Sequence, residues 1–477
     1  MRMMIAALVC LSILMFSAIA SAAEWPQYRA DGQRSGYTAE QLPRELHLQW
    51  NYVVPHLPEP AWPDVYWQRQ TYDLAYQPVV AGGTLFYGSS ADCKVYAIDA
   101  ASGRLRWSFF TDGPVRFAPA VWRERVFAVS DDGYLYCLAA SDGSLLWRKR
   151  GGTESSRILG NGRIVSRCPA RGGPVIQDDV LYFGAGVFPS HGFFLHAVDP
   201  ETGETIWRND TSGNLRQNHI TGGYAFGNVT SQGYLATSGN TLVVPTGRAI
   251  PAAFDRTTGA FRYFEPLELS YAGGSWLMAV DKMVFNSDMI LDLETGYTLS
   301  NKVGNPAQQI QVRERPTRAE RMIEAAASPT RIFIATGTRI KAVDRGHPLD
   351  DHSNTWDQTQ GLYFLWRGPT AQQRSPHRAF ATADLWSVPV DCQGAVIVAG
   401  ETIFAGGEGK VTAVDVTSRS PIWSYPVKGT AYGLAVADGR LYVSTDAGLL
   451  YGFGAESPAE PTTWQTEPVQ MPYGDLT

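Results

Sequence analysis

A unit of roughly 40 residues recurs along this chain, and this recurrence limits the fold more than any other feature of the sequence. In the clearest copy, an alternating strand ends at Asp99, a tight turn follows with Gly103, and a second strand ends at Trp107. The turn glycine supplies the positive φ that such a turn needs, and the tryptophan suits packing between neighbouring sheets. Further copies lie at 136–147, 195–207, 254–263, 291–299 and 414–423, the last without the glycine.

Another hairpin precedes each unit, for example at 83–88 and 240–244, so each repeat holds about four strands. We therefore predict an all-β fold, an eight-bladed β-propeller, with blades near 76–111, 116–149, 171–210, 230–265, 273–302, 323–367, 393–427 and 431–453. The last blade lacks a closing strand, and we expect the N-terminal segment 46–52 to supply it, which removes free sheet edges. The tryptophans expected to dock neighbouring blades are Trp50, Trp107, Trp147, Trp207, Trp366 and Trp423.

The segments outside the repeats carry their own signals. Arg2, an apolar run to Ile19 and the small residues 20–22 predict a signal peptide over 1–22, with an uncleaved anchor as the less favoured alternative. The propeller is predicted over 24–454, with insertions near 303–327 (partly a short charged helix) and 345–362, and a disordered tail over 455–477. No later stretch reaches the roughly 20 apolar residues of a spanning helix. We thus expect a periplasmic or secreted protein with no membrane span after cleavage.

Charge and cysteine content narrow the function. The chain has 40 Lys and Arg against 46 Asp and Glu, without a basic stripe, which argues against nucleic acid as a partner. Four cysteines remain after cleavage, Cys93, Cys137, Cys168 and Cys392; two disulfides are permitted, but buried or partly paired thiols are favoured and the pairing stays open. The GxSxG, HExxH and P-loop motifs are absent, and Asp131-Asp132-Gly133 is interpreted as a hairpin turn.

The Asp-x-x-[Ser/Thr/Asp]-Gly-x-x-x-Trp repeat is similar to that of the PQQ-like (quinoprotein alcohol dehydrogenase-like) β-propellers, and residues 24–36 resemble the opening segment common in such proteins. The resemblance covers nearly all of the mature chain. It implies either a dehydrogenase that holds pyrroloquinoline quinone (PQQ), usually with Ca²⁺, and oxidises alcohols or sugars, or a non-catalytic propeller such as the β-barrel assembly lipoprotein of the outer membrane. The fold alone does not choose between these classes.

The residues give the dehydrogenase class little support. The family's alcohol dehydrogenases carry two adjacent cysteines near the cofactor, and no two cysteines are adjacent in this chain. Calcium needs several converging oxygen ligands. Candidates by residue type alone are Asp281, Asn286, Asp288, Asp391 and Gln393. PQQ and calcium are therefore possible but unsupported by motifs, and we expect no cofactor, no metal and no catalytic residue.

The loops that enter each innermost strand approach the centre of a propeller, so their polar side chains are candidates for binding a ligand. They are Gln77, Arg116, Arg171, His219, Arg248 and Gln393. Arg171 beside two glycines suits an anionic ligand, although a salt bridge between blades or a carbonyl clamp is favoured. We hypothesise a monomeric, non-catalytic binding or scaffold module for an envelope protein or glycan. The alternatives are a PQQ-dependent alcohol or sugar dehydrogenase, and another enzyme with its site in the channel.

Overall fold

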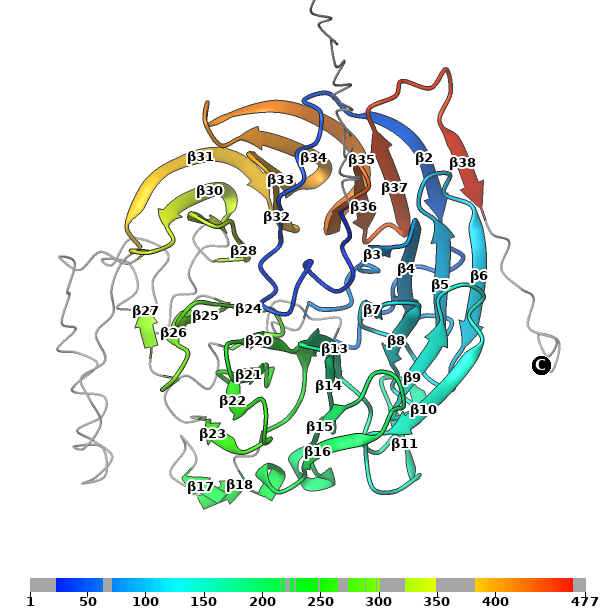
Figure 1. The fold of residues 1–477 in the computed structure, drawn as a ribbon, viewed down its shortest axis with the longest axis vertical. Coiled ribbons are helices and arrows are strands. Elements are labelled where there is room, and N and C mark those ends of the chain that lie inside the picture. Colours follow the sequence, from blue (N-terminus) through cyan, green and yellow to red (C-terminus); the bar gives the residue numbers. More distant parts are fainter. Residues whose placement is uncertain are drawn as a thin grey trace, which may run out of the picture.

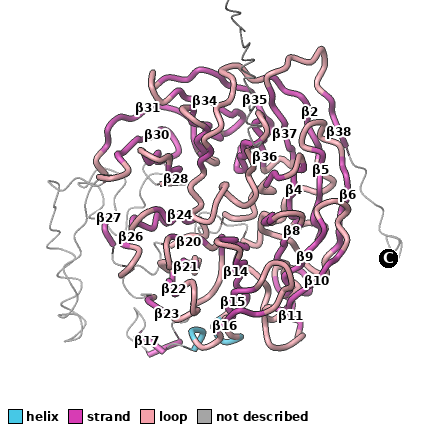
Figure 2. The backbone as a smooth tube through the Cα atoms, in the orientation of Figure 1, coloured by secondary structure: helices cyan, strands magenta, loops and turns pink. Residues whose placement is uncertain are grey.

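The computed structural model describes residues 23–62, 71–214, 216–218, 224–226, 229–247, 249–264, 273–287, 289–296, 298–300, 322–348 and 382–465. This part of the chain is all-β, and its helical segments, η1 (Pro189–His191) and η2 (Ser212–Asn214), are single 3-10 turns (Figure 2). Small antiparallel sheets stand around a common centre (Figure 1), which confirms the predicted β-propeller class. Among these residues, no helix is long and apolar enough to cross a membrane.

Most sheets are four-stranded meanders in chain order, as alternating strands joined by tight turns require. The first two are β3–β6 (Val79–Ala81, Thr84–Ser89, Lys94–Asp99, Leu105–Phe110) and β7–β10 (Ala120–Trp122, Arg125–Val129, Tyr134–Ala139, Leu145–Arg150). The third is β13–β16 (Gly172–Gln177, Val180–Ala185, Phe194–Val198, Thr205–Asn209), to which β19 (Gly233–Tyr234) adds in parallel. Then come β20–β23 (Ala236–Ser238, Thr241–Val244, Ala252–Asp255, Phe261–Tyr263) and β24–β27 (Leu277–Val280, Met283–Asn286, Met289–Asp292, Thr298–Ser300).

The C-terminal repeats form one nine-stranded sheet because the long strand β35 (Ser420–Ala437) runs through two successive meanders. Its other central strands are β32 (Val396–Ala399), β33 (Thr402–Gly406), β34 (Glu408–Asp415), β36 (Arg440–Thr445) and β37 (Leu449–Gly454). The N-terminal strand β2 (His47–Val53) pairs antiparallel with β37, and Trp50 lies opposite Gly452. At the other edge of the nine-stranded sheet, β1 (Tyr37–Thr38) pairs in parallel with β32.

The sheet β28–β31 (Glu324–Ala327, Arg331–Ala335, Gly337–Asp344, Asp384–Cys392) differs from its prediction at the closing strand, which is β31 rather than the segment at Trp366. Residues 324–327 form its first strand, in agreement with the blade predicted near 323–367, so the insertion predicted near 303–327 extends too far at its end. Trp386 lies opposite Ala342, as Trp107 lies opposite Ala97. Since Phe-Leu-Trp at 364–366 has the same local pattern as Leu385-Trp386, the sequence offered two closing segments. Trp366 and the insertion 349–362 lie outside the described residues.

The predicted disordered tail is wrong for its first part. Residues 462–465 form β38 (Thr462–Gln465), which pairs in parallel with β2. The indole of Trp464 donates a hydrogen bond to the Ser102 carbonyl (2.7 Å). Packing of the Trp464 ring and pairing with the free edge of β2 therefore order residues for which the Pro- and Glu-rich composition predicted disorder.

The repeat residues dock neighbouring sheets on one another. Five of the six predicted docking tryptophans are described, and each donates its Nε1–H to a backbone carbonyl of the following sheet or of the segment that leads into it. These bonds join Trp50 to Ala100 (3.1 Å), Trp107 to Ala140 (3.0 Å), Trp147 to Glu201 (3.1 Å), Trp207 to Arg256 (3.0 Å) and Trp423 to Leu46 (2.9 Å). Each bond satisfies the one polar group of a ring that otherwise packs as an apolar surface.

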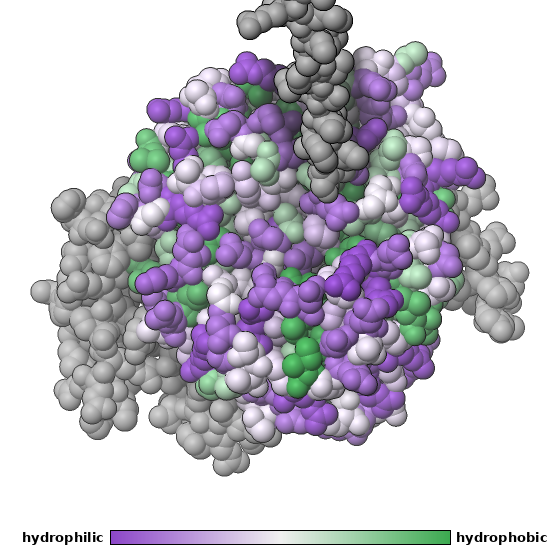
Figure 3. All heavy atoms as spheres, viewed as in Figure 1, coloured by the Kyte–Doolittle hydropathy of each residue, from purple (hydrophilic) through white to green (hydrophobic). Residues whose placement is uncertain are grey.

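A meander of four strands gives the ring two faces. We call the face with the turns between first and second strands the turn face, and the opposite one, where the chain passes to the next sheet, the connection face. The segment 23–38, here called the N-terminal collar, lies on the turn face and crosses the centre in dark blue in Figure 1. Atoms cover the centre of that face, which is largely hydrophilic (Figure 3).

The collar accepts hydrogen bonds from the ends of successive inner strands. The donors and acceptors are Asp438 N to Ala23 O, Val80 N to Trp25 O, Val121 N to Pro26 O, Ile176 N to Gln27 Oε1, Thr237 N to Gly32 O, Ala279 N to Gln33 O, Ala327 N to Ser35 O and Val398 N to Gly36 O (2.7–3.2 Å). Two buried arginines hold it inside: Arg29 pairs with Glu324 (2.5 Å), and Arg34 donates to the Leu235 and Pro174 carbonyls (2.7 Å each). The collar thus ties the sheets together in chain order.

The four predicted cysteines are free thiols in this structure. Cys137, Cys168 and Cys392 are buried, and Cys93 is half-buried beside the Arg163 guanidinium (3.7 Å). Burial raises the pKa of all four thiols. These cysteines are therefore poor nucleophiles at neutral pH.

Candidate functional site

Two of the predicted arginines meet two aspartates at the centre of the connection face. We call Asp73, Arg116, Asp131 and Arg171 the central ion cluster. Arg116 contacts Asp73 (Nη1–Oδ2 2.7 Å) and Asp131 (Nε–Oδ2 2.7 Å), and Arg171 binds Asp131 through two bonds of 2.8 Å. Each of these side chains is at most 3% exposed. The cluster therefore holds two positive and two negative charges away from water.

Local structure brings these groups together. Arg116 and Arg171 lie in the connections that lead into β7 and β13, Asp73 precedes β3, and Asp131 lies in the turn between β8 and β9. All of these segments end on the connection face. Asp131 was predicted only as a turn residue; its position beside an inter-sheet connection was the signal that it faces the centre.

The charges of the two arginines are balanced within the cluster, although Asp73 Oδ1 is buried without a hydrogen-bond partner. Burial alone would raise the pKa of Asp131, but Arg171 and Arg116 outweigh it and lower this pKa to about 2. For Asp73 burial dominates and raises the pKa, although Arg116 opposes this. Burial also opposes the charge of Arg116, yet Asp131 and Asp73 raise its pKa. Both guanidiniums are thus held as cations by the chain's own carboxylates, which is the salt bridge between sheets that the sequence favoured for Arg171.

A projecting hairpin covers the cluster. Strands β11 (Arg157–Gly160) and β12 (Arg163–Ser166) form a separate two-stranded sheet, and its Asn-Gly turn has φ of 54° at Asn161 and 72° at Gly162. Asn161 accepts a hydrogen bond from Arg171 Nη2 (2.8 Å) and donates one to the Ala61 carbonyl. The turn is therefore anchored over the centre. This element was not predicted.

A column of aromatic rings fills the interior below the cluster. Tyr72 stacks on Phe117 (ring centroids 4.7 Å apart), and Phe117 meets Tyr234 edge to face (5.0 Å). Tyr234 stacks in turn on Tyr28 of the collar (3.5 Å). All four rings are buried. The column thus connects the connection face to the N-terminal collar through the middle of the propeller.

Two other predicted binding residues lie apart from the cluster. Gln77 is buried and donates from Nε2 to the Tyr432 carbonyl (3.0 Å), while Gln393 donates from Nε2 to Asp391 Oδ1 (3.4 Å). Of the four predicted residues that the structure describes, Arg116 and Arg171 are therefore brought together here. His219 and Arg248 lie outside the described residues.

The described residues at the centre do not fit PQQ or a metal. A quinone carboxylate needs a free cation, whereas Arg116 and Arg171 already bind carboxylates, and stacked rings occupy the volume behind them. Of the calcium candidates, Asp281 pairs with Arg345 (2.8 Å) and Asn286 donates to the Trp276 carbonyl (2.6 Å), so the two serve local contacts. Within the described ranges, no three His, Cys, Asp or Glu side chains gather as a metal site. Asp288 lies outside them.

Comparisons with known proteins give two kinds of relative. A family model described as outer membrane protein assembly factor BamB matches residues 60–186, 191–353 and 377–467. Dehydrogenase subunits of quinone alcohol dehydrogenases match at 30% identity: that of Gluconobacter oxydans (strain 621H) over 150 residues, 28% of this chain and 18% of the relative, and that of Komagataeibacter europaeus over 156 residues, 29% and 20%. The chain thus covers about a fifth of the length of these curated relatives.

Solved structures share the fold at low identity. Quinohemoprotein alcohol dehydrogenase from Comamonas testosteroni superposes with a TM-score of 0.57 at 16% identity, covering 92% of this chain and 82% of that one. A europium-containing methanol dehydrogenase gives 0.57 at 13% identity, covering 91% and 98%. At these identities the likeness concerns the fold alone.

Proposed function

Because this chain belongs to the family described as outer membrane protein assembly factor BamB, we propose that it is an exported, non-catalytic propeller that binds a protein of the cell envelope. The observation that carries the proposal is that the two arginines at the centre are paired within the chain. The two cations of the central ion cluster bind carboxylates of the same chain, and Asn161 covers them. Polar groups at the centre are then structural, and recognition moves to the surface around them.

We further propose that the ring has eight blades and closes through β2. Six four-stranded units precede the nine-stranded sheet, which divides into two blades that share β35. The antiparallel pairing of β2 with β37 gives the last blade its fourth strand. The collar supports this count, since its acceptors meet eight successive inner strands.

The hairpin β11–β12 is the surface best suited to a protein partner. Leu159 and Ile164 lie directly opposite each other on it and are 79% and 64% exposed. The two-stranded sheet leaves both edges unpaired by other described strands. An exposed apolar pair beside a free edge is the arrangement that accepts an added strand from a partner. We therefore assign the partner surface to this hairpin.

The test is a hairpin variant, L159D together with I164D, compared with the matched change L145D and L146D at two exposed leucines of β10. Each protein is used to capture partners from a solubilised envelope fraction, and the captured protein is then purified and its Kd measured. We expect the hairpin variant to bind at least tenfold more weakly and the control to bind as the unaltered protein does. Equal binding by both variants would remove the hairpin from the proposal.

A PQQ-dependent dehydrogenase is the second candidate, favoured by the quinone alcohol dehydrogenase subunits among the relatives. It is tested by adding PQQ and Ca²⁺ to the mature chain and recording cofactor absorbance and Tm after desalting. Retained cofactor with a raised Tm would overturn the non-catalytic proposal and justify assays with alcohols and sugars. We expect neither.

The location is also a proposal, since residues 1–22 lie outside the described residues. Cleavage near Ala23 would leave the collar at the new N-terminus, where Ala23 already accepts a bond from Asp438 N. Sequencing the N-terminus of protein recovered from the periplasmic fraction tests this. A chain that starts at Met1, or one found only in the cytoplasm, would contradict it.

A further inference from the structure

One junction between sheets departs from the repeat. At five other junctions, an aromatic ring lies directly against the turn glycine of the next sheet, so that a Cβ there would come within 2.4–2.8 Å of the ring. The pairs are Trp50 with Gly103, Trp107 with Gly143, Trp147 with Gly203, Trp207 with Gly259 and Tyr263 with Gly296. Glycine at this position is therefore what lets each ring seat fully.

Arg419 replaces that glycine in the turn that follows β34. It keeps the backbone of the repeat, with φ of 56° and its N–H bonded to the Asp415 carbonyl (2.9 Å), as Gly103 bonds to Asp99 (2.8 Å). Trp386 packs on Phe333 as the other repeat tryptophans pack on a ring of their own sheet (centroids 5.9 Å apart, against 5.8 Å for Phe86 and Trp107). The exchange therefore keeps the repeat and adds a long cationic side chain at the junction between the sheets β28–β31 and β32–β35.

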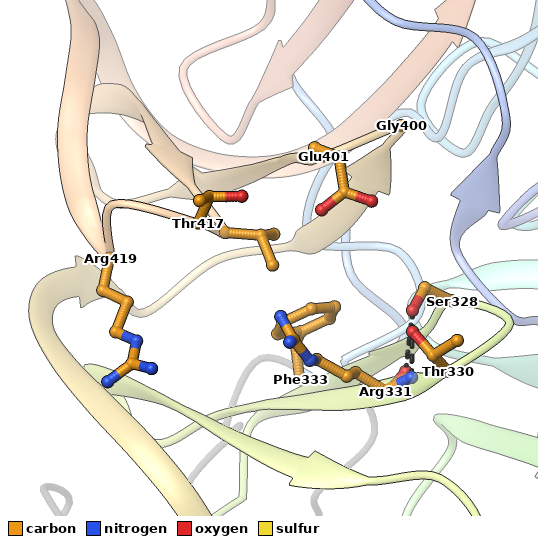
Figure 4. Close-up of a pocket in the computed structure, with 9 residues that line it drawn as sticks. Ser328, Thr330, Arg331, Phe333, Gly400, Glu401, Thr417 and Arg419 are labelled. Carbon is orange, nitrogen blue, oxygen red and sulfur yellow. Dashed lines mark hydrogen bonds between the residues drawn. The ribbon is translucent and has the colours of Figure 1, made fainter.

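A cavity of about 290 Å³ lies beside this turn, between the sheets β28–β31 and β32–β35, on the turn face (Figure 4). Arg331 and Arg419 line it, and neither guanidinium has an ion-pair or hydrogen-bond partner among the described residues. Glu401 lies across the cavity from Arg331, and its carboxylate points inward in Figure 4. The hydroxyl-bearing residues Thr330 and Thr417 complete the polar rim.

We infer that this cavity binds a saccharide that carries a carboxylate, such as a hexuronic acid unit of a glycan. A guanidinium presents a planar fork of donors that matches a carboxylate, and the cavity offers two that form no ion pair with a described residue. Glu401 adds an acceptor for sugar hydroxyls. A volume of 290 Å³ is near the lower end of ligand sites, which suits one sugar ring.

The site is independent of the partner surface proposed above. It lies on the turn face, whereas the hairpin β11–β12 covers the centre of the connection face. Failure of one proposal therefore leaves the other standing.

Binding is tested by calorimetry on the full mature chain with an oligogalacturonate of three units, the neutral oligomer of equal length, and sulfate. We expect binding of the acidic oligomer only. R331A and R419A should each weaken it at least tenfold, while R104A, at an exposed arginine in the turn after β5, should leave it unchanged. Equal binding of the neutral oligomer, equal binding of sulfate, no binding at all, or the same Kd in all three variants would each overturn the assignment.

A second variant keeps the test separate from folding defects. R419G removes one guanidinium of the cavity and gives the turn the glycine of the other five turns, which suits the positive φ of 56° there. We expect this protein to lose the acidic oligomer while its Tm rises. Undiminished affinity in R419G would refute the site, since the cavity would then not be where the ligand binds.

Discussion

Asp131→Asn tests whether the centre is built for stability. The substitution keeps the shape of the side chain but removes the charge that binds both Arg116 and Arg171. Arg116 would keep Asp73, and Arg171 would keep only the neutral Asn161. Breaking a buried pair while the partner charge remains costs about 3–5 kcal/mol. The variant should therefore be much less stable than a surface change would make it.

The expected shift in melting temperature follows from the size of the chain. Unfolding entropy near about 2.1 cal/mol/K per residue gives roughly 0.9 kcal/mol/K for a folded unit of roughly 440 residues. A loss of about 4 kcal/mol then lowers Tm by roughly 4 °C. Asp112→Asn is the control: its carboxylate is 66% exposed and lies 3.7 Å from Arg157, so Tm should fall by less than about 1 °C.

The pH dependence supplies a second readout of the same change. Since the pKa of Asp131 is lowered to about 2 from an ordinary 3.8, its contribution is complete above about pH 4 and is lost as the pH falls toward 2. The gap in urea stability between the unaltered protein and D131N should thus be constant from pH 7 to 5 and shrink below pH 4. A Tm shift no larger than that of D112N, or a gap that widens in acid, would refute the reasoning.

Two further predictions concern buried contacts. Burial lowers the pKa of His196 to about 4 from 6.5, so the unfolded chain binds one proton more than the folded chain between these pH values. The free energy of unfolding should therefore fall by up to about 3 kcal/mol on acidification from pH 6.5 to pH 4. Urea unfolding of H196F should lack this pH dependence. G143A places a Cβ 2.5 Å from Trp107, whereas the Cβ of G439A, at a similar φ (72° against 75°), meets open space. In thermal unfolding, G143A should lose about 2 kcal/mol more stability than G439A. Equal losses in the two variants would contradict docking of Trp107 on the glycine.

The repeat predicted most of the fold because its signals are local. Period-2 strands, turn glycines and a terminal tryptophan each depend on a few neighbouring residues, and they placed the repeat sheets from β3 to β26, though not the hairpin β11–β12, close to their observed positions. Prediction failed where the chain offered two equivalent segments. Trp366 and Trp386 each follow an apolar residue in a similar context, and only the register of β31 against β30 selects Trp386.

Of the central ion cluster, the two arginines were predicted and the two aspartates were not, again because local signals can be read from the sequence and distant contacts cannot. Arg116 and Arg171 were identified because they lie in connections next to inner strands, a position that topology sets. Their partners come from other places: Asp73 precedes the first sheet and Asp131 sits in a turn. Sequence spacing does not reveal such pairs, since 43 residues separate Arg116 from Asp73 and 40 separate Arg171 from Asp131.

Where the repeat is kept, its polar groups are consumed by the fold. Indole N–H groups bind carbonyls of the next sheet, and the collar takes up backbone donors at successive inner strands. The exposed pair Leu159 and Ile164 and the unpaired guanidinium of Arg419 lie where the repeat is altered, in the added hairpin and in a turn with arginine in place of glycine. Exposed groups of this kind add little stability, so they are available to partners outside the chain. The two proposals thus assign recognition to departures from the repeat, one on each face of the ring.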